Sequence, residues 1–421
     1  MKKFKIVTLG CRTNQYESQG YRDQLLTLGY TPAEENEAAD VCIVNTCTVT
    51  GSADSSSRHQ IRQLARENPG SFLAVTGCFA ESQPKLVEEI EGVTHLISNR
   101  DKERLVELLF PDESVPEFSI RNFEAHTRAF VKVQDGCNSF CTYCVIPYVR
   151  GRSRSRPVSE IVQEVERLIA NGYKEVVITG INVGDFDGDP EPEAEPTRLA
   201  DLVRIVDRIP GLKRLRISSI DPDEVDDALM EAVIHGKTTC PSLHLVLQSG
   251  SNVILKRMNR KYTRQIFLDA VERLKTIRPD FTFTTDVIVG FPGETESDFE
   301  ETLAVMREVK FAKVHMFPYS PRPRTRAALF PNPVPTAIVN VRKQIVLRTA
   351  EQTAFELREA YLGKCLKILT EARDEINPSH IHGHTENFLP VWVDDQSLQP
   401  NQIVDVEMIA NTPVGLQGKI V

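Results

Sequence analysis

The residues of this chain best suited to chemistry are three closely spaced cysteines, Cys137, Cys141 and Cys144. They form a CxxxCxxC run directly after a short apolar segment. Three thiolates at this spacing suit an iron–sulfur cluster in which one iron has no protein ligand. A structural zinc site is the alternative, but structural zinc is closed and tetrahedral, and no Cys or His occurs in the next 20 residues. The run therefore favours an iron–sulfur site.

Three further cysteines are far apart in the sequence but occupy equivalent places. Cys11, Cys47 and Cys78 each come at the end of an apolar run. In a parallel sheet the carboxyl ends of the strands meet at one edge, where such folds bind ligands. Glycines beside Cys11 and Cys78 would let the backbone approach a bulky inorganic group. The pattern predicts a second cluster, with three buried structural thiols as the alternative.

The remaining cysteines have no such pattern. Cys42 lies inside a predicted strand, Cys365 begins one, and Cys240 lies in a Thr-Thr-Cys-Pro segment that we interpret as a turn. We expect these three to be structural.

Two alternations of apolar runs and helical patterns position the cysteines. The first covers residues 1 to about 110, with strands expected at 4–9, 41–46, 72–76 and 94–97, and predicts a parallel α/β sheet. The second has six apolar runs spaced like βα units, which predicts a partial (β/α)6 barrel. These runs lie at 130–133, 175–179, 215–218, 243–247, 284–289 and 314–317. Barrels of this kind carry their chemistry at the carboxyl ends of the strands, where the CxxxCxxC run lies.

The last part of the chain has a different pattern. A helix is expected from the Pro-rich break at 331–335 to about Tyr361, followed by β-like runs at 365–369, 389–393 and 403–409. These runs predict a small β-barrel, a fold that often binds RNA. The predicted domains are therefore 1–115, 122–350 and 355–421. The acidic segment 185–195 is expected to be a solvated loop.

Charge and hydropathy narrow the function classes. No run approaches the roughly 18 apolar residues of a membrane helix, and the apolar stretch after Met1 is too short for a signal peptide. We therefore expect a cytoplasmic protein with no membrane contact. The net charge of −9 disfavours a nucleic-acid partner, but segment 121–156 has seven Lys or Arg against two acids. Local basic patches of this kind decide phosphate binding.

The CxxxCxxC run, with Tyr143 before its last cysteine, resembles the signature of radical S-adenosylmethionine (SAM) enzymes. Together with the three upstream cysteines and the β-rich tail, the whole chain resembles the methylthiotransferase family. That family has an N-terminal methylthiotransferase domain, a radical SAM core and a TRAM domain. Motifs at 10–18, 45–50 and 383–391 are most similar to the bacterial branch that acts on threonylcarbamoyl-adenosine at tRNA position 37.

The resemblance implies two 4Fe–4S clusters. Cys137, Cys141 and Cys144 would hold the one whose open iron chelates SAM, and reductive cleavage of SAM would give a 5′-deoxyadenosyl radical. Such a radical can attack an adenine C–H bond that is not acidic enough for a side-chain base. The second cluster, on the three N-terminal cysteines, would carry or deliver sulfur, and a second SAM would supply the methyl group. A reductant and a sulfur donor are also implied, and we expect a monomer.

The resemblance also implies cofactor and RNA contacts. SAM contacts are expected from strand-end residues: Tyr143, Gly180, Asn182, Ser218, Gln248 and Gly290. Arginines of the run 150–156 are expected to contact phosphates of the anticodon stem-loop, with the modified base splayed into the cavity. Asn387, Phe388 and Trp392 are candidate RNA contacts in the tail, or ordinary packing.

The chain departs from the family in two places. It has Val246 where Pro is usual, and a basic segment with Arg322, Arg324 and Arg326 replaces a less charged one. These arginines contact phosphate or belong to a solvated loop.

Other functions remain open at this point. The same chemistry on isopentenyl-adenosine of tRNA, or on an aspartate of a ribosomal protein, is the nearest alternative. A non-catalytic RNA-binding protein with iron–sulfur clusters and a zinc-ribbon-like structural protein are the more distant ones.

Overall fold

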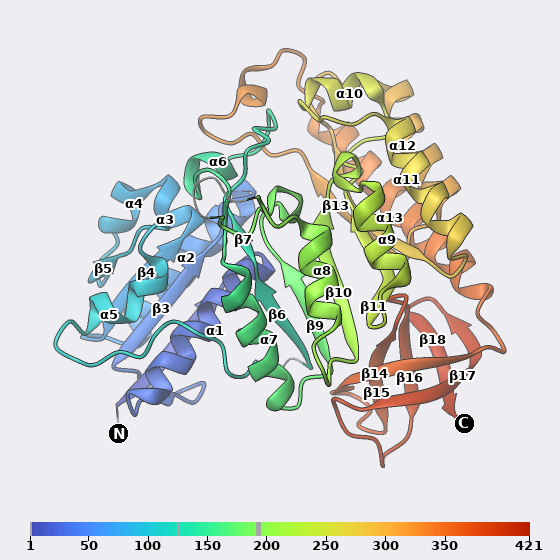
Figure 1. The fold of residues 1–421 in the computed structure, drawn as a ribbon. Helices are drawn as coiled ribbons and strands as arrows, with labels where there is room; N and C mark the ends of the chain where they lie inside the picture. The colour runs from blue at the N-terminus through green and yellow to red at the C-terminus, as the bar shows by residue number, and fades with distance from the viewer. Residues whose placement is uncertain (1, 124–126, 191–194) are drawn as a thin grey trace.

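The computed structural model describes residues 2–123, 127–190 and 195–421. Three sheets follow one another along the chain and lie side by side (Figure 1). Part of the acidic segment expected as a loop, residues 191–194, lies outside the described residues. Among the described residues, no helix is both long and apolar enough to span a bilayer.

The N-terminal sheet is parallel throughout, in the order β2-β1-β3-β4-β5, as the alternation predicts. Its strands are β1 (Lys3–Thr8), β2 (Thr31–Pro32), β3 (Val41–Thr46), β4 (Phe72–Gly77) and β5 (His95–Leu96). Its helices are α1 (Arg12–Thr27), α2 (Gly51–Glu67), α3 (Cys78–Ser82), α4 (Pro84–Glu88) and α5 (Leu105–Leu109). Apolar side chains of α1 and α5 cover one face of the sheet, and those of α2, α3 and α4 cover the other. Helices on both faces leave the carboxyl edge as the open side of this sheet.

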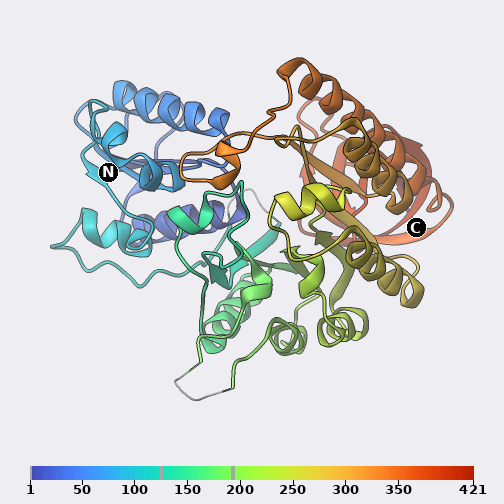
Figure 2. The same ribbon diagram turned by 90° about the horizontal axis from the view of Figure 1, so that it is seen from above.

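The central sheet has six parallel strands in the order β6-β9-β10-β11-β12-β13 and curls into a half-barrel (Figures 1 and 2). The strands are β6 (Arg128–Lys132), β9 (Glu175–Thr179), β10 (Arg214–Ile220), β11 (Thr239–Leu245), β12 (Thr282–Val289) and β13 (Lys313–Pro318). The larger helices that follow them are α7 (Val158–Ala170), α8 (Leu199–Asp207), α9 (Asp227–His235), α11 (Arg264–Ile277), α12 (Glu296–Val309) and α13 (Thr336–Glu359). The prediction of a partial (β/α)6 barrel is confirmed. Cys240 lies within β11, so the interpretation of its segment as a turn is wrong.

The C-terminal strands form a closed barrel in the order β14-β15-β16-β18-β17. They are β14 (Cys365–Arg373), β15 (His380–Thr385), β16 (Pro390–Asp394), β17 (Ile403–Thr412) and β18 (Gly415–Ile420). The barrel packs against the amino-terminal end of the half-barrel (Figure 1). There Arg214 donates to the carbonyls of His384 (3.0 Å) and Lys367 (2.8 Å), which fixes the barrel through its backbone.

Two of the tail residues expected to contact RNA lie in this interface. Asn387 is buried and donates from Nδ2 to the carbonyl of Asp280 at 3.1 Å. The ring of Phe388 lies 5.1 Å from the guanidinium of Arg216. Trp392 is half-buried, with its ring centroid 4.4 Å from that of His380. Packing therefore accounts for the buried Asn387, whereas Phe388 is half-buried and its contact with RNA stays a prediction.

A buried network of charges joins the N-terminal sheet to the half-barrel. Lys102 lies 2.6 Å from both Glu17 of α1 and Asp135, which follows β6. Arg150 lies 3.2 Å from Glu17 and 2.9 Å from Asp135. Lys132 of β6 adds a third cation, 3.7 Å from Glu17. Residues of both sheets therefore share the same buried charges.

The loop after β13 makes a second connection (Figure 2). Arg322 is buried and donates to Thr48 at 2.8 Å and to Asp54, both in the N-terminal part. The hydroxyl of Ser320 accepts from the amide of Gly51 at 3.0 Å. Arg322 therefore joins two parts of the chain and is not available to phosphate, in contrast to the exposed Arg324 and Arg326.

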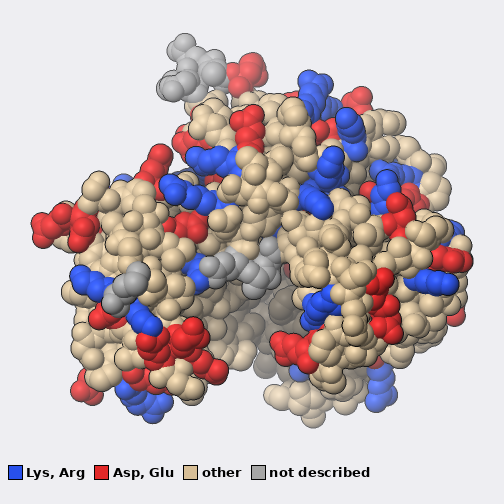
Figure 3. Space-filling model, turned by 90° about the horizontal axis from the view of Figure 1, so that it is seen from below, with Lys and Arg blue, Asp and Glu red and all other residues tan. Residues whose placement is uncertain are grey.

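The face seen from below shows how charge is distributed on this side. Acidic and basic side chains are interspersed there, and no extended patch of one sign is visible (Figure 3). The phosphate backbone of a nucleic acid would therefore meet both positive and negative side chains on this face.

We predict that Glu17→Gln destabilises the protein strongly. The pKa of Glu17 is lowered to about 2, because Lys102 and Arg150 outweigh the burial that would raise it. Removing this charge leaves buried cations without their partner, a defect that costs about 3–5 kcal/mol. Thermal unfolding monitored by circular dichroism should therefore shift to clearly lower temperature.

Glu107→Gln is the matched control. Glu107 also pairs with an arginine, Arg104 at 2.9 Å, but both side chains are more than half exposed. Surface pairs of this kind contribute little, so the control should unfold at the wild-type temperature. Equal unfolding temperatures for the two variants would contradict the role of the network.

Candidate active site

The CxxxCxxC run lies on the loop between β7 (Gln134–Asp135) and α6 (Ile146–Val149), close to the carboxyl end of β6. The short antiparallel pair of β7 with β8 (Arg154–Ser155) closes this loop. The amide of Cys137 donates to the carbonyl of Gly151 at 3.1 Å, and that of Cys144 to the carbonyl of Cys141 at 3.0 Å. The backbone therefore holds the three cysteines on one compact turn.

Gly136 makes this closure possible. It has a φ of +76°, and a Cβ at this position would lie 2.0 Å from the carbonyl oxygen of Arg152. Any other residue would push the two arms of the loop apart. The glycine is therefore required for the position of Cys137.

Arg260, from the segment after α10 (Asn252–Arg257), supports the same loop. Its Nη1 donates to the sulfur of Cys141 at 3.1 Å, and its Nη2 contacts Asp221. Burial, with the charge of Cys141, raises the pKa of Cys144 to about 12. A buried thiol of this kind loses its proton when a metal replaces it, and hydrogen bonds to sulfur are one of the features that tune iron–sulfur clusters. The donor set fits a cluster with three thiolate ligands.

The three N-terminal cysteines meet at the carboxyl edge of their sheet. Cys11 precedes α1, Cys47 follows β3, and Cys78 begins α3. At Gly10, which has a φ of +94°, an added Cβ would lie 2.9 Å from the sulfur of Cys47. The loops after β1 and β3 are therefore in contact, as expected from the pattern, although the role of these cysteines as ligands stays a prediction.

Asn14 fixes the geometry of these loops. Its Nδ2 donates to the carbonyls of Leu9 at 2.7 Å and of Thr46 at 3.1 Å, residues that lie just before Cys11 and Cys47. Its Oδ1 lies 3.8 Å from the sulfur of Cys11. One side chain therefore holds two of the three cysteine loops together.

Arg150 connects the two groups of cysteines. It follows α6, directly after the CxxxCxxC loop, yet its Nε donates to the sulfur of Cys78 at 3.3 Å. Its Nη2 also donates to Asn14. The guanidinium is buried, so it cannot contact phosphate as expected for the run 150–156. Burial raises the pKa of the Cys78 thiol, and the charge of Arg150 beside it offsets part of this effect.

Within the described residues, no three His, Cys, Asp or Glu side chains are grouped as a single metal ion would require. A mononuclear zinc ion needs its ligands about 2.0–2.3 Å from one point.

A cavity of about 170 Å³ lies at the carboxyl end of the half-barrel. We call it the upper cavity. Its lining consists of Val49, Thr50, Tyr143, Gln248, Asp286, Ile288, Phe317, Pro318, Tyr319 and Ser320. Val49 and Thr50 come just after Cys47, and Tyr143 directly precedes Cys144, so segments next to both groups of cysteines line this cavity, although no cysteine is among its lining residues.

Two of the expected cofactor contacts have unused hydrogen-bonding capacity. Ser218 Oγ and Gln248 Oε1 are buried and have no hydrogen-bond partner among the described residues. Buried polar atoms without partners are rare in native proteins. Gln248 also has a φ of +58°, an uncommon conformation for this residue. Both atoms fit a site completed by a polar ligand.

The other four expected contacts have protein partners. Tyr143 packs edge-on against Phe291, with ring centroids 6.3 Å apart. The amides of Ile181 and Asn182 donate to Gln134 Oε1, which also lies 3.0 Å from the position of a Cβ on Gly180. A Cβ on Gly290 would lie 2.5 Å from Val339 of α13. Gly290 therefore faces a helix and not the upper cavity, and packing explains the glycine.

Asn182 has a second partner that the sequence did not indicate. Its Nδ2 donates to Glu224 Oε1 at 2.8 Å. Burial, with the nearby charge of Asp221, raises the pKa of Glu224 to about 7. Glu224, Gln134 and Arg260 have no distinctive motif around them, and only the fold brings them to this rim.

Two exposed arginines lie beside the CxxxCxxC loop. Arg152 stacks over Phe140 at 4.4 Å, and Arg324 over Tyr148 at 5.0 Å, each measured to the ring centroid. Arg156, by contrast, is bound to Glu164 at 2.9 Å. The expected phosphate contacts of this run are therefore limited to its exposed members, Arg152 and Arg154.

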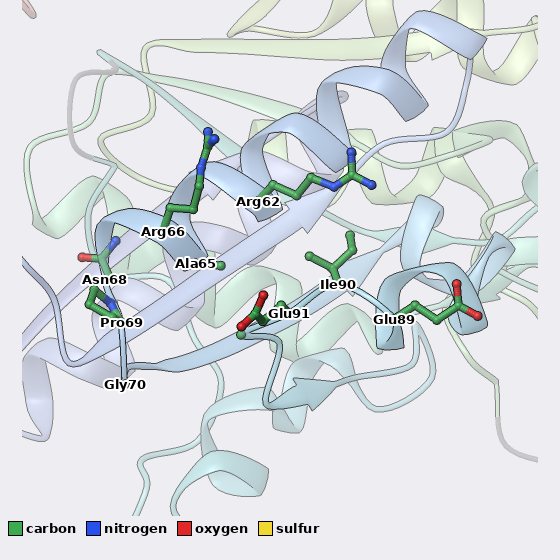
Figure 4. Close-up of a pocket in the computed structure, with 10 residues that line it drawn as sticks. Arg62, Ala65, Arg66, Asn68, Pro69, Gly70, Glu89, Ile90 and Glu91 are labelled. Atoms are coloured by element: carbon green, nitrogen blue, oxygen red, sulfur yellow. The ribbon is translucent and has the colours of Figure 1, made fainter.

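A larger cavity, of about 600 Å³, lies between α2 and the segment after α4 (Figure 4). Arg62 and Arg66 line one side of it, and Glu89 and Glu91 line the other. Its lining residues do not flank either group of cysteines, and its charged groups are exposed. We assign it no part in the chemistry.

Comparisons with known proteins agree with this arrangement. Residues 131–306 match the radical SAM superfamily, and residues 3–98 match the uncharacterized protein family UPF0004. The chain is similar to a solved radical SAM methyltransferase, TsrM from Kitasatospora setae, with a TM-score of 0.55 and 15% identity over 75% of this chain and 73% of that one. This likeness supports the fold alone.

Curated relatives extend along the whole chain. The threonylcarbamoyladenosine tRNA methylthiotransferase MtaB of Chlamydia pneumoniae is 48% identical over 99% of this chain and 98% of its own length. MtaB of Bacillus subtilis is 36% identical over 96% and 92%. A tRNA-2-methylthio-N(6)-dimethylallyladenosine synthase of Finegoldia magna is 33% identical over 99% and 94%. Since both cysteine-bearing domains and the full length of these relatives match, this chain belongs to the radical SAM methylthiotransferase family.

Proposed function

We propose that this protein transfers a methylthio group to carbon 2 of threonylcarbamoyl-adenosine at position 37 of tRNA. The observation that carries the proposal is the upper cavity, which is lined by segments next to both groups of three cysteines. The relatives that carry this activity in their names are 36–48% identical to the chain, and the dimethylallyladenosine synthase of Finegoldia magna is 33% identical. The 48% identity to the Chlamydia pneumoniae relative, against 32–35% for the dimethylallyladenosine synthases, favours threonylcarbamoyl-adenosine over isopentenyl-adenosine.

In this proposal the two cysteine groups hold two 4Fe–4S clusters. Cys137, Cys141 and Cys144 hold the cluster that binds SAM, and Cys11, Cys47 and Cys78 hold the cluster that supplies sulfur. Such clusters and SAM, when bound, supply one-electron cleavage of the cofactor and sulfur insertion at an unactivated C–H bond. The protein acts in the cytoplasm as a monomer, and its domain boundaries lie near residues 115 and 350. It depends on a reductant and a sulfur donor.

The side chains around the upper cavity bind and orient the cofactor, and they exclude water from the cavity. Gln248, which lines the upper cavity, and Ser218 of β10 offer buried polar atoms without partners to the cofactor. Tyr143 and Ile288 supply apolar walls, while Val49 closes the cavity from the N-terminal side. Excluding water protects a reactive radical from side reactions.

The anticodon stem-loop would approach from the side of the CxxxCxxC loop. Arg152 and Arg324 are exposed there and lie over aromatic rings. Arginines of this kind bind phosphates, and their aromatic neighbours stack on unpaired bases. This arrangement supports the entry of a splayed base toward the upper cavity.

Iron content tests the two-cluster assignment. After anaerobic reconstitution we expect about eight irons per chain, and about four in a variant with Ala at Cys11, Cys47 and Cys78, because each four-iron cluster needs its own thiolates. Iron and labile sulfide per chain are the measurements. About four irons in both proteins would leave one cluster and return the N-terminal cysteines to a structural role.

Cys47→Ala separates the two roles. SAM cleavage to 5′-deoxyadenosine should persist, while methylthiolation of threonylcarbamoyl-adenosine tRNA should fall below detection, since Cys47 lies in the other group of cysteines. Chromatography of both products is the measurement, and the exposed Cys365 offers a control in Cys365→Ala, which should keep both activities. Methylthiolation by Cys47→Ala at the wild-type rate would contradict the assignment.

Substrate identity needs three parallel assays. Wild-type protein is given tRNA with threonylcarbamoyl-adenosine, tRNA with isopentenyl-adenosine, or the ribosomal-protein substrate. We expect methylthiolation of the first alone. Methylthiolation of one of the other two substrates instead would support the proposed reaction but contradict threonylcarbamoyl-adenosine as its target.

A further inference from the structure

A second cavity lies deeper in the half-barrel, below the upper cavity, and is rich in arginine. We call it the arginine cavity. It is lined by Arg12, Arg128, Val177, Arg216, Ile217, Ser242, His244, Thr284 and Phe388. Its volume of about 30 Å³ admits about two water-sized groups. Three guanidinium groups around so small a space favour an anion.

Two of the three arginines already have carboxylate partners. Arg216 lies 2.6 Å from Glu175, and Arg128 lies 3.4 Å from Glu371. These carboxylates neutralise charge in the wall of the cavity. Arg12 is therefore the arginine of this cavity whose charge could be neutralised by a bound anion.

Arg12 has no ion pair or hydrogen bond within the part of the chain that the structure describes. Its recorded partner is the ring of Phe130, 5.5 Å from the guanidinium carbon. By its accessible surface Arg12 is exposed to solvent, and its side chain also lines the arginine cavity. An arginine in such a place keeps all five donors for a ligand.

The two cavities meet at one pair of residues. Asp286 lines the upper cavity and His244 lines the arginine cavity. Their side chains approach to 3.4 Å, between Asp286 Oδ1 and His244 Nε2. A ligand in the upper cavity therefore has the arginine cavity directly beside it.

We propose that Arg12 binds the carboxylate of the threonylcarbamoyl group and so makes this substituent part of what the enzyme recognises. The inference rests on the proposed function, because that substrate carries a free amino-acid carboxylate on the adenine while a dimethylallyl group carries none. A carboxylate fits the small cavity and matches the fork of donors on arginine. Arg12 directly follows Cys11, so the same loop carries a proposed cluster ligand and the specificity residue.

The test uses reconstituted protein and two anticodon stem-loops. One carries threonylcarbamoyl-adenosine, and the other carries the same group with its carboxylate converted to a methylamide. Arg12→Gln and Arg12→Met are compared with wild type. Arg66→Gln is the matched control, because Arg66 is an exposed arginine of the distant cavity in Figure 4. KM and kcat for each stem-loop, the Kd of SAM and iron per chain are measured.

We expect wild type and Arg66→Gln to have a roughly 10- to 100-fold lower KM for the carboxylate than for the methylamide, the usual effect of one charged hydrogen-bonded contact. Both Arg12 variants should lose this preference through a higher KM for the carboxylate. Iron content and the Kd of SAM should stay at the wild-type values. This pattern separates substrate recognition from a structural role.

Four outcomes would overturn the inference. Wild type without a preference would show that no carboxylate is recognised, and Arg12 variants that keep the preference would place recognition elsewhere. A weaker Kd of SAM with the preference retained would assign Arg12 to the carboxylate of the cofactor. Loss of iron in both variants would make Arg12 structural.

Failure of the proposed function would look different. Wild type would then methylthiolate neither threonylcarbamoyl stem-loop but would act on an isopentenyl-adenosine stem-loop or the ribosomal protein. The two failures are therefore distinguishable in the same series of assays.

Discussion

The buried charges between the N-terminal sheet and the half-barrel are the constraint on which the active site depends. Glu17 and Asp135 are shared by Lys102 and Arg150, at distances of 2.6 to 3.2 Å. Removing charges from water costs several kcal/mol per ion, and only well-placed partners compensate for it. The two sheets are therefore held in the one relative position in which every buried charge has a partner, and this position brings segments next to both groups of cysteines to a common cavity.

The same network extends directly to the sulfur atoms. Its buried part holds three cations, Lys102, Lys132 and Arg150, against two buried carboxylates, with the half-exposed Glu103 adding a third acid at its margin. One cation of this network, Arg150, also contacts the sulfur of Cys78. Thiolates are favoured beside a fixed cation, and metal ligation requires thiolates. The network that joins the sheets thus also contacts one group of cysteines, where the charge of Arg150 offsets part of the burial that raises the pKa of Cys78.

Local patterns predict the strands of the two parallel sheets and the edges at which the cysteines emerge, because buried strands and βα spacing are visible over short stretches. Cys240 shows where local reasoning fails. Pro241 suggests a turn, but it lies where the pairing of β10 with β11 is irregular, and proline is tolerated at such places. The sequence of a basic run likewise does not show which of its arginines are buried. Arg150, Arg156 and Arg322 resemble surface charges, and only long-range contacts with Glu17, Glu164 and Asp54 bury them or occupy them.

The half-barrel explains why all three parts of the chain take part in the site. A closed β/α barrel fills its interior with its own side chains, whereas six curled strands leave the interior open. Arg12 enters it from the N-terminal sheet and Phe388 from the C-terminal barrel. The cysteine loops are built on glycines and strand ends that tolerate little change. The interior can therefore be altered through its two flanking parts while the cysteines stay in place, so that one family can keep its chemistry and change the substituent that it accepts on the base.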